Sequence, residues 1–470
     1  MGAVGRHSGI SRRSLIRTVG VAAAGGLVAA SQQTRTRAAR VTGRPAAAPA
    51  IQEGQFQGVT LRISTQSGPS TEAWKPLLPA FEAKYGATVE IEETPFQQIQ
   101  AKQFAEAQAD TGAYDLIDLQ YFDLGKFVVG GVLADLTPFF DNPDLVDPNY
   151  DIGDFVPVVL DAYGKYEVDG EQGLYALPHK FDIYLGMYRH DLFDAAGVPP
   201  PAEGFTYDDL IGAAEQLQST QGENPAVTIA LQGPGPAFTT WSAIFRSHGG
   251  EYFDANKYPL FTNEAAVTAV ETLRSLLPYM PIDALSLAFD PAVRIMAQGR
   301  TAFAENWNSF LPPLLDPEQS TVVDKVAFIP TPAGPVRRAQ ELGGWCVGLS
   351  PDSRNKEAAF LLLQHLTSKE TAVQYALAGG SSARVSVATN EQVVEQIPYY
   401  PLMIDALQNA VPRPTDPTWG QTQGAIGTAV NAALQPGGSA LSELTEAART
   451  VYQVVQRMGF HPEETGPPPE

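Results

Sequence analysis

The chain has 470 residues, of which 44% are hydrophobic and 18% are charged. A chain of this length exceeds the size at which a single hydrophobic core stops growing, so we expect two core-bearing units. Its formal charge of −21 would repel phosphate backbones, which excludes nucleic acid as the expected partner and disfavours anionic small ligands.

Residues 1–50 are predicted to form an export signal and a linker. They contain eight arginines and no acidic residue, and Ser11-Arg-Arg-Ser-Leu-Ile16 precedes a weakly apolar run that ends at Ala30. This pattern resembles a twin-arginine signal, which directs an already folded protein out of the cytoplasm. We therefore expect the protein in the periplasm or at the outer face of the cytoplasmic membrane, where an uncleaved signal would tether it.

The body of the protein is predicted to open with strands and helices in alternation. Strands are predicted at residues 59–64, 88–92 and 115–119, with helices at 74–85 and 99–109 between them. This succession is typical of a parallel α/β layer, in which ligands bind just past the carboxyl ends of the strands. The residues at those ends are Gln66, Thr94 and Gln120 to Asp123.

The stretch from Gly173 to Leu210 is predicted to carry the chain from one lobe to another. It begins as a polar and aromatic strand that ends near Asp182, continues as a second strand, and enters a helix capped by Thr206. Acidic residues in the first turn of this helix suit the positive end of its dipole. We expect the residues just past Pro178 to face a ligand.

The second half of the chain is predicted to add further strands and a helical end. A strand from Thr301 to Glu305 leads into Asn306-Trp307-Asn308, and Gly343-Gly-Trp345 belongs to another strand. Apolar residues at near-heptad spacing predict a helix from Ser439 to Met458. Residues 461–470 are predicted to be a disordered tail.

Neither a cofactor nor a metal site is predicted. The loop from Asp141 to Asp154 is rich in aspartate, but its spacing fits no EF-hand and it lacks the closing glutamate, so we interpret it as a solvated acidic loop. The single cysteine, Cys346, has no partner for an internal disulfide and no nearby histidine in sequence. We expect it to be a small packed residue.

A series of short motifs, in order along the mature chain, resembles family 1 extracellular solute-binding proteins. These proteins are the substrate-capturing subunits of ABC importers, and maltose- and trehalose-binding proteins belong to the group. Each motif is short, but together they cover nearly the whole mature chain. The motifs are Tyr114-Asp-Leu-Ile, Gly131-Val-Leu-Ala-Asp-Leu136, Leu174-Tyr-Ala-Leu-Pro178, Tyr188-Arg-His-Asp-Leu192, Phe205-Thr-Tyr-Asp-Asp-Leu210, Gln298-Gly-Arg-Thr-Ala-Phe303, Gly343-Gly-Trp345 and Asn355-Lys-Glu-Ala-Ala359.

The resemblance implies a two-lobed α/β fold of the periplasmic-binding-protein type, with several hinge crossings and a helical C-terminal region. It implies crossings near residues 177–181, 329–331 and 367–370. The expected lobes are 51–178 with 329–368, and 179–328 with 369–460. A ligand would bind between the lobes, hinge rotation would close them, and the closed monomer would dock on the transmembrane subunits of a permease.

The resemblance also implies ligand contacts at particular positions. A sugar needs aromatic platforms for its apolar faces and planar polar side chains for its hydroxyl groups. Carried over position by position, the family's contacts fall on Gln66, Gln120, Asp182, Tyr184, Trp307, Gly343, Trp345 and Arg384. Relatives often carry aspartate at position 120, where this chain has glutamine with Asp118 and Asp123 close by.

Several of these positions have an alternative interpretation as structural residues. Asp123 and Trp241 are further candidates for the cleft, and Trp241 is as well explained by packing. Trp345 precedes alternating apolar residues, which suit a core position, and Arg384 could pair with one of the many carboxylates. Trp307 is favoured as a ligand contact because two asparagines bracket it at a strand end.

Two rival functions stay open beside the capture of a neutral di- or oligosaccharide. A binder of glycerol-phosphate-type anions would need a cationic cluster, for which Arg384 and Arg413 are the candidates. An exported glycoside hydrolase would need paired carboxylates, for which Asp118, Asp182 and Glu305 are the candidates. The chain has no zinc-protease, nucleophile-elbow or Walker motif, and the resemblance is to a receptor, so we expect a protein that is not an enzyme.

Overall fold

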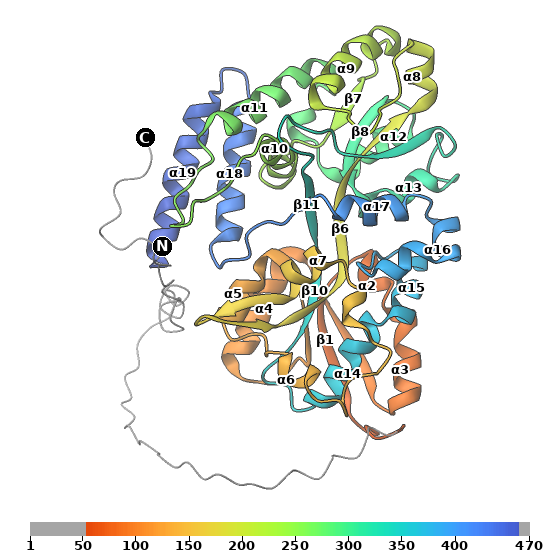
Figure 1. The fold of residues 1–470 in the computed structure, drawn as a ribbon, viewed down its shortest axis with the longest axis vertical. Coiled ribbons are helices and arrows are strands. Elements are labelled where there is room, and N and C mark those ends of the chain that lie inside the picture. The colour runs from red at the N-terminus through yellow and green to blue at the C-terminus, as the bar shows by residue number, and fades with distance from the viewer. Residues whose placement is uncertain (1–52, 460–470) are drawn as a thin grey trace, which may run out of the picture.

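The computed structural model describes residues 53–459, which form two α/β lobes stacked along the long axis of the molecule (Figure 1). A nine-stranded sheet extends through both lobes in the order β2-β1-β3-β10-β6-β8-β7, with β11 and β9 paired at its sides. The predicted signal, linker and tail lie outside the described residues. Among the described helices, none combines the length and the apolarity that a membrane crossing requires.

Lobe 1, the lower lobe of Figure 1, is built on three parallel strands. These are β1 (Thr60–Gln66), β2 (Thr88–Thr94) and β3 (Leu116–Gln120), so the predicted alternation of strands and helices is confirmed. The helices between and after them are α2 (Pro69–Glu72), α3 (Leu78–Tyr85), α4 (Phe96–Ala109), α5 (Leu124–Val129), α6 (Thr137–Phe140) and α7 (Pro157–Gly164). A hairpin of β4 (Lys165–Val168) and β5 (Glu171–Leu174) precedes the crossing between the lobes.

The helix α4 begins three residues earlier than the sequence predicted. Pro95 occupies its N-cap position, and Phe96 is its first residue. A proline is well tolerated there because it has no amide hydrogen to leave unpaired. The early start places the glutamines of Phe96-Gln-Gln-Ile-Gln100 on the first turns of the helix, next to the carboxyl end of β3.

The crossing between the lobes is one long strand, β6 (Ala176–Arg189), where the sequence predicted two. Its first half pairs with β10 (Gln340–Leu349), and its second half pairs with β8 (Phe303–Trp307) and β9 (Val326–Pro330). The register with β10 shifts next to Pro178: Trp345 pairs with Lys180 and Cys346 pairs with Pro178, which leaves His179 as an extra residue. A bulge at this point lets a strand accommodate the proline without being interrupted.

Lobe 2, the upper lobe of Figure 1, packs helices on both sides of β7 (Val227–Ile229) and β8. Thr206 caps α9 through a capping box with Asp209, which confirms the predicted start of that helix. The helices of this lobe are α8 (His190–Ala196), α9 (Tyr207–Gln221), α10 (Gly235–Ser247), α11 (Glu264–Leu276), α12 (Phe289–Ala297) and α13 (Pro312–Leu315).

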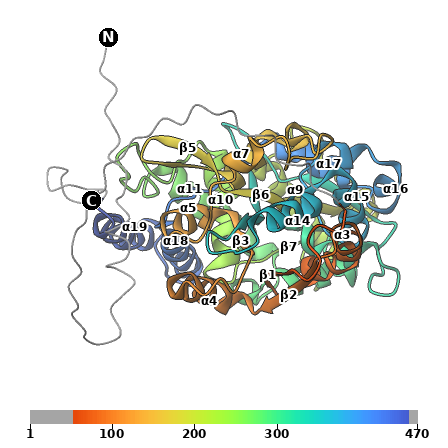
Figure 2. The same cartoon turned by 90° about the horizontal axis from the view of Figure 1, so that it is seen from below.

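The C-terminal part of the chain divides between the lobes. Its elements are α14 (Lys356–Thr367), α15 (Lys369–Leu377), α16 (Glu391–Gln396), α17 (Tyr400–Leu407), β11 (Ala410–Val411), α18 (Trp419–Leu434) and α19 (Ala440–Arg457). The helices α18 and α19 pack on α10 and α11 of lobe 2, at the end of the molecule opposite α15 and α16 (Figure 2). The helix α15 packs on the lobe 1 turn Lys75–Leu77, although its residues follow the expected crossing into lobe 2. All five residues of β9 pair with the lobe 2 half of β6, so Ile329 and Pro330 extend lobe 2 two residues beyond the expected boundary.

Candidate functional site

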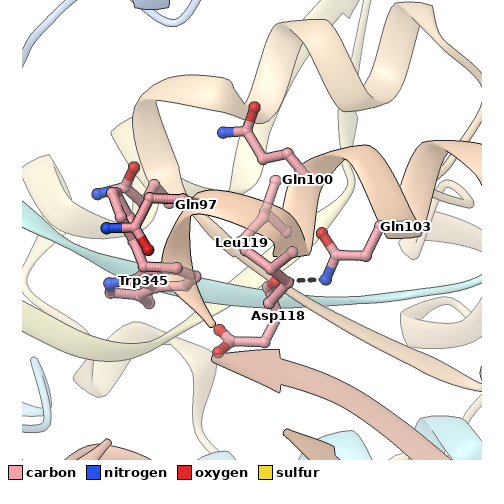
Figure 3. Close-up of a pocket in the computed structure, with 9 residues that line it drawn as sticks. Gln97, Gln100, Gln103, Asp118, Leu119 and Trp345 are labelled. Atoms are coloured by element: carbon pink, nitrogen blue, oxygen red, sulfur yellow. Dashed lines mark hydrogen bonds between the residues drawn. The ribbon is translucent and has the colours of Figure 1, made fainter. Parts of the chain in front are cut away.

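A pocket of about 230 Å³ lies where β3 ends, between helix α4 and strand β10. This is the strand-end position at which a parallel α/β layer is expected to bind ligands. Figure 3 shows Gln97, Gln100 and Gln103 of α4 on one side, with Asp118, Leu119 and Trp345 opposite them. The complete lining is Phe96, Gln97, Ile99, Gln100, Gln103, Asp118, Leu119, Gln120 and Trp345.

The floor of the pocket is a buried polar network centred on Asp118. Its carboxylate contacts Nε2 of His179 at 2.7 Å and accepts a hydrogen bond from Oγ1 of Thr65 at 2.6 Å. The imidazole also packs on Trp74, with 4.3 Å between the ring centroids. The bulge in β6 directs His179 towards Asp118, so the network joins the pocket to the strand that links the lobes.

Beside the pocket, residues of the hinge strands β10 and β6 stand in two rows that begin at Trp345 and at Gly343. Trp345 pairs with Gln120 on one side and with Lys180 on the other, and Gly343 pairs with Asp182. Residues directly opposite one another on neighbouring strands share a face of the sheet, so these side chains line one surface. Nζ of Lys180 lies 3.2 Å from Oδ2 of Asp182, while Oδ1 of Asp182 has no hydrogen-bond partner within residues 53–459.

Trp307 of lobe 2 lies against the same surface. It ends β8 opposite Tyr184, whose ring meets it edge-on at a centroid distance of 5.2 Å. A β-carbon on Gly343 would lie 3.1 Å from Cζ3 of Trp307, so the glycine makes room for the indole ring. The amide of Asn306 accepts a hydrogen bond from the backbone of Trp307, which fixes the end of the strand.

The structure therefore brings together five of the predicted contact residues: Gln120, Asp182, Trp307, Gly343 and Trp345. Gln66 ends β1 at the same edge of the sheet, with its backbone carbonyl bound by Thr71 at 2.6 Å. Asp123 lies behind the pocket, hydrogen-bonded to Gln100. Burial raises the pKa of Asp123 to about 6, although Lys126 opposes this shift.

Three other predicted contacts prove to be interior residues. Trp241 is fully buried in α10, where its indole nitrogen donates to the carbonyl of Ala266 at 3.0 Å and its ring stacks on Phe245. Tyr184 is fully buried behind Trp307 and reaches Thr240 through its hydroxyl group at 3.2 Å. Each of these side chains is enclosed by protein atoms, which supports the structural interpretation of both positions over a ligand contact.

Arg384 is the third of these interior positions. Its guanidinium group is fully buried over the rings of Tyr150 and Phe155, at 4.7 and 4.2 Å from their centroids. Nε donates to the carbonyl of Thr367 at 2.6 Å, and Nη1 lies 3.4 Å from the carboxylate of Asp154. Its charge is thus neutralised inside the protein and is not offered to an anion.

Sequence reasoning missed the amide-rich turn of α4, the Asp118–His179 contact and Lys180. The helix prediction started at residue 99 and left Phe96 and Gln97 outside it. A run of three glutamines within Phe96 to Gln100, directly after a strand end, was the available signal. The Asp118–His179 contact had no such signal, because a strand bulge creates it between residues 61 positions apart.

The chain is similar in sequence to known proteins. Residues 67–373 match the family model described as "Bacterial extracellular solute-binding protein". A probable amino-acid ABC transporter periplasmic-binding protein of Sinorhizobium fredii is 28% identical over 76% of this chain and 80% of its own length. An erythritol/L-threitol-binding protein of Mycolicibacterium smegmatis is 25% identical over 80% and 81% of the two chains.

A solved structure supports the fold directly. It is an ABC transporter solute-binding protein from Agrobacterium radiobacter in complex with ribitol, which is 25% identical to this chain. The two superpose with a TM-score of 0.75 over 85% of this chain and 99% of the other. The predicted two-lobed periplasmic-binding-protein fold is therefore confirmed.

Proposed function

Since this chain belongs to the bacterial extracellular solute-binding protein family and is the solute-binding subunit of an ABC importer, we propose that it captures a small neutral polyol or sugar between its lobes. The family is one of receptors and not of enzymes. The ligand would lie on the surface formed by Gln120, Trp345 and Asp182, with Trp307 closing over it from lobe 2.

The observation that carries this proposal is the pairing of two indole rings with amide and carboxylate groups on one surface. Trp345 and Trp307, which are 5% and 7% exposed, border this surface with flat apolar rings of the kind that suits the carbon face of a polyol or sugar. Gln97, Gln120 and the unpartnered oxygen of Asp182 offer hydrogen bonds to hydroxyl groups.

The charges near the site favour a neutral ligand over an anion. Arg413, which sequence reasoning considered for an anion site, is buried and ion-paired with Glu341 at 2.9 Å. Lys180 is likewise paired with Asp182. An anion would have to break one of these pairs and leave a carboxylate beside it, which is costly in a buried environment.

The pocket that lobe 1 and Trp345 contribute to the site is small, which supports a smaller ligand than the di- or oligosaccharide expected from the sequence. A volume of about 230 Å³ lies below the ~300–1,000 Å³ typical of sites for drug-sized molecules. A linear polyol or a monosaccharide fits this scale better than a chain of sugars. The relatives that bind ribitol and erythritol or L-threitol support the same size class.

An amino acid is the second candidate ligand. Lys180 and Asp182 lie side by side on β6, next to the row that holds Trp345, and such a pair could receive the carboxylate and the ammonium group of a zwitterion. The name of the Sinorhizobium fredii relative points the same way. This candidate requires the pair to open, whereas a neutral polyol leaves it intact.

Capture would close the lobes about β6 and β10. A ligand that contacts both Trp345 and Trp307 gains contacts in the closed form that it lacks in the open form, and the closed population rises accordingly. The closed monomer would then dock on the transmembrane subunits of the permease. Export by the twin-arginine route and tethering by an uncleaved signal belong to the same proposal.

A thermal-shift screen tests the proposal. Protein comprising residues 51–470 would be heated with ribitol, mannitol, erythritol, glucose, maltose, glycerol 3-phosphate and a set of L-amino acids. A ligand present at 100 times its dissociation constant stabilises the folded state by about 2.7 kcal/mol, a shift of several degrees. We expect a polyol or monosaccharide to give this shift in the parent protein and in the surface control Ile282→Ala, but not in Trp307→Ala.

The other outcomes of the screen are equally informative. Stabilisation by amino acids alone would establish the second candidate and overturn the first. Stabilisation by glycerol 3-phosphate alone would restore the anion binder. Turnover of a glycoside at catalytic protein concentrations would contradict the receptor function altogether.

A further inference from the structure

Arg413 lies where the two lobes meet, in the segment between β11 and α18. Its backbone amide donates to the hydroxyl oxygen of Tyr121 at 2.9 Å, and Tyr121 in turn donates to the carbonyl of Leu342 at 3.0 Å. Tyr121 directly follows β3 of lobe 1, and Leu342 belongs to the hinge strand β10. The backbone of Arg413 is thus fixed to lobe 1 and to the hinge together.

The guanidinium group of Arg413 is held by residues of lobe 2 and the hinge. Nη2 lies 2.9 Å from the carboxylate of Glu341 on β10, and Nε donates to the same oxygen at 3.0 Å. Further hydrogen bonds reach Gln423 of α18 and Thr239 of α10, at 3.0 and 3.3 Å. The second oxygen of Glu341 accepts from Ser242 of α10, so both oxygens of this buried carboxylate have partners.

The same guanidinium group contacts three aromatic rings. Its central carbon lies 5.6 Å from the ring centroid of Trp307, 5.5 Å from that of Phe122 and 5.0 Å from that of Phe238. These distances are within the range of cation–π attraction. Phe122 belongs to lobe 1 and Phe238 to lobe 2, so one cation lies against rings of both lobes and against the indole ring of Trp307.

We propose that Arg413 is a positioning residue, which holds the indole ring of Trp307 in the orientation that receives the solute. The ion pair with Glu341 fixes the orientation of the guanidinium plane, and the cation–π contact with that plane fixes the ring of Trp307. Arg413 itself does not contact the solute. The expected effect of Arg413 on ligand affinity rests on the proposed function, because it needs Trp307 to contact the ligand. The expected effect of Arg413 on the orientation of the Trp307 ring does not depend on that function.

Arginine is required in this role because the role depends on shape as well as on charge. The planar guanidinium group uses Nε, Nη1 and Nη2 towards different partners, an arrangement that the single ammonium group of lysine does not reproduce. Arg413→Lys therefore keeps the charge that neutralises Glu341 but loses the plane that lies near Trp307. Any change in the Trp307 ring that Arg413→Lys causes is therefore due to the lost guanidinium plane and not to a lost charge.

The first test needs no ligand. Tryptophan fluorescence and its quenching by acrylamide would be measured for the parent and Arg413→Lys, each with a Trp307→Phe counterpart so that the Trp307 signal is obtained by difference. We expect the Trp307 signal of Arg413→Lys to shift and its quenching constant to rise by at least about twofold, because the ring is released. An unchanged Trp307 signal would overturn the proposal, whatever the protein binds.

The second test measures coupling by calorimetry with ribitol as the probe. We expect Arg413→Lys to weaken the affinity by at least about fivefold in the parent but by less than about twofold when Trp307 is already phenylalanine. Equal effects in both backgrounds would show a merely structural role and overturn the proposal. Failure of the parent to bind ribitol would count against the proposed ligand only, because the fluorescence test stands without it.

Two further variants control for a general loss of stability and for a failure of Arg413→Lys to fold. Arg246→Lys alters another buried arginine that pairs with an acid, Glu251, and lies over a ring, Tyr252, so it should lower stability without moving the Trp307 signal. Should Arg413→Lys fail to fold, Gln423→Ala removes one hydrogen bond from the same guanidinium group and should give a smaller change of the same sign. A Trp307 signal unchanged in Gln423→Ala would then count against the proposal.

Discussion

The stability of the protein should fall as pH rises, and Glu305 should carry much of this effect. The carboxyl group of Glu305 is fully buried in β8, and neither of its oxygens has a hydrogen-bond partner within the described part of the chain. Burial raises its pKa from 4.5 to about 8. The folded protein therefore keeps this carboxyl group protonated at neutral pH, beside the hydroxyl groups of Tyr184 and Tyr207.

The sign and the size of the effect follow from proton linkage. Between pH 4.5 and about 8 the unfolded chain has released the proton and the folded chain has not, so the stabilising contribution is complete below pH 4.5 and is lost as pH rises through 8. Each pH unit in this window costs about 1.4 kcal/mol. The whole window corresponds to roughly 5 kcal/mol, comparable to the total stability of many domains.

Urea unfolding of residues 51–470 at a series of pH values from 5 to 9 measures this slope, with Glu305→Gln as the matched neutral variant. The free energy of unfolding of Glu305→Gln should fall less with rising pH than that of the parent. The difference between the two proteins should therefore shift steadily in favour of the variant as pH rises. Asp123, whose pKa is raised to about 6, leaves a residual slope of the same sign in both proteins. Parallel curves for the two proteins would refute the reasoning.

Three other predictions concern the site and its supports. Trp345→Ala removes the ring that meets Phe96 at 6.2 Å and should weaken solute binding by at least about tenfold, as measured by calorimetry; an unchanged affinity would remove Trp345 from the site. Gly343→Ala places a β-carbon 3.1 Å from the ring of Trp307 and should weaken binding more than it lowers the melting temperature; the reverse order would show that the glycine serves only folding. Arg384→Met leaves the carboxylate of Asp154 without its buried partner and should cost about 3–5 kcal/mol of unfolding free energy, with the solute affinity of the folded protein unchanged; a selective loss of affinity would return Arg384 to the cleft.

Local patterns predicted much of the fold correctly because the features concerned are local. The alternation of strands and helices from Thr60 to Gln120 follows from apolar spacing and from turn residues. The capping box at Thr206 and Asp209 is a contact within four residues, so the sequence contains all of it. The position of the pocket follows in turn from the parallel order of the strands.

The errors arose where contacts distant in sequence decide the outcome. Trp241 and Trp307 were both plausible cleft residues in the sequence, yet helix packing encloses Trp241 in α10, whereas Trp307 ends strand β8 of lobe 2. Arg413 and Glu341 are 72 residues apart, and no local pattern pairs them. The continuous strand β6 required a bulge at His179, which depends on the register of β10.

Calorimetric titration of residues 51–470 with ribitol and mannitol would show whether the protein captures a polyol against Trp307, with Trp307→Ala and the exposed control Ile282→Ala measured beside the parent. We expect one bound polyol per chain for the parent and the control, with binding lost in Trp307→Ala. Binding of charged solutes in place of polyols, or polyol binding that survives in Trp307→Ala, would contradict it.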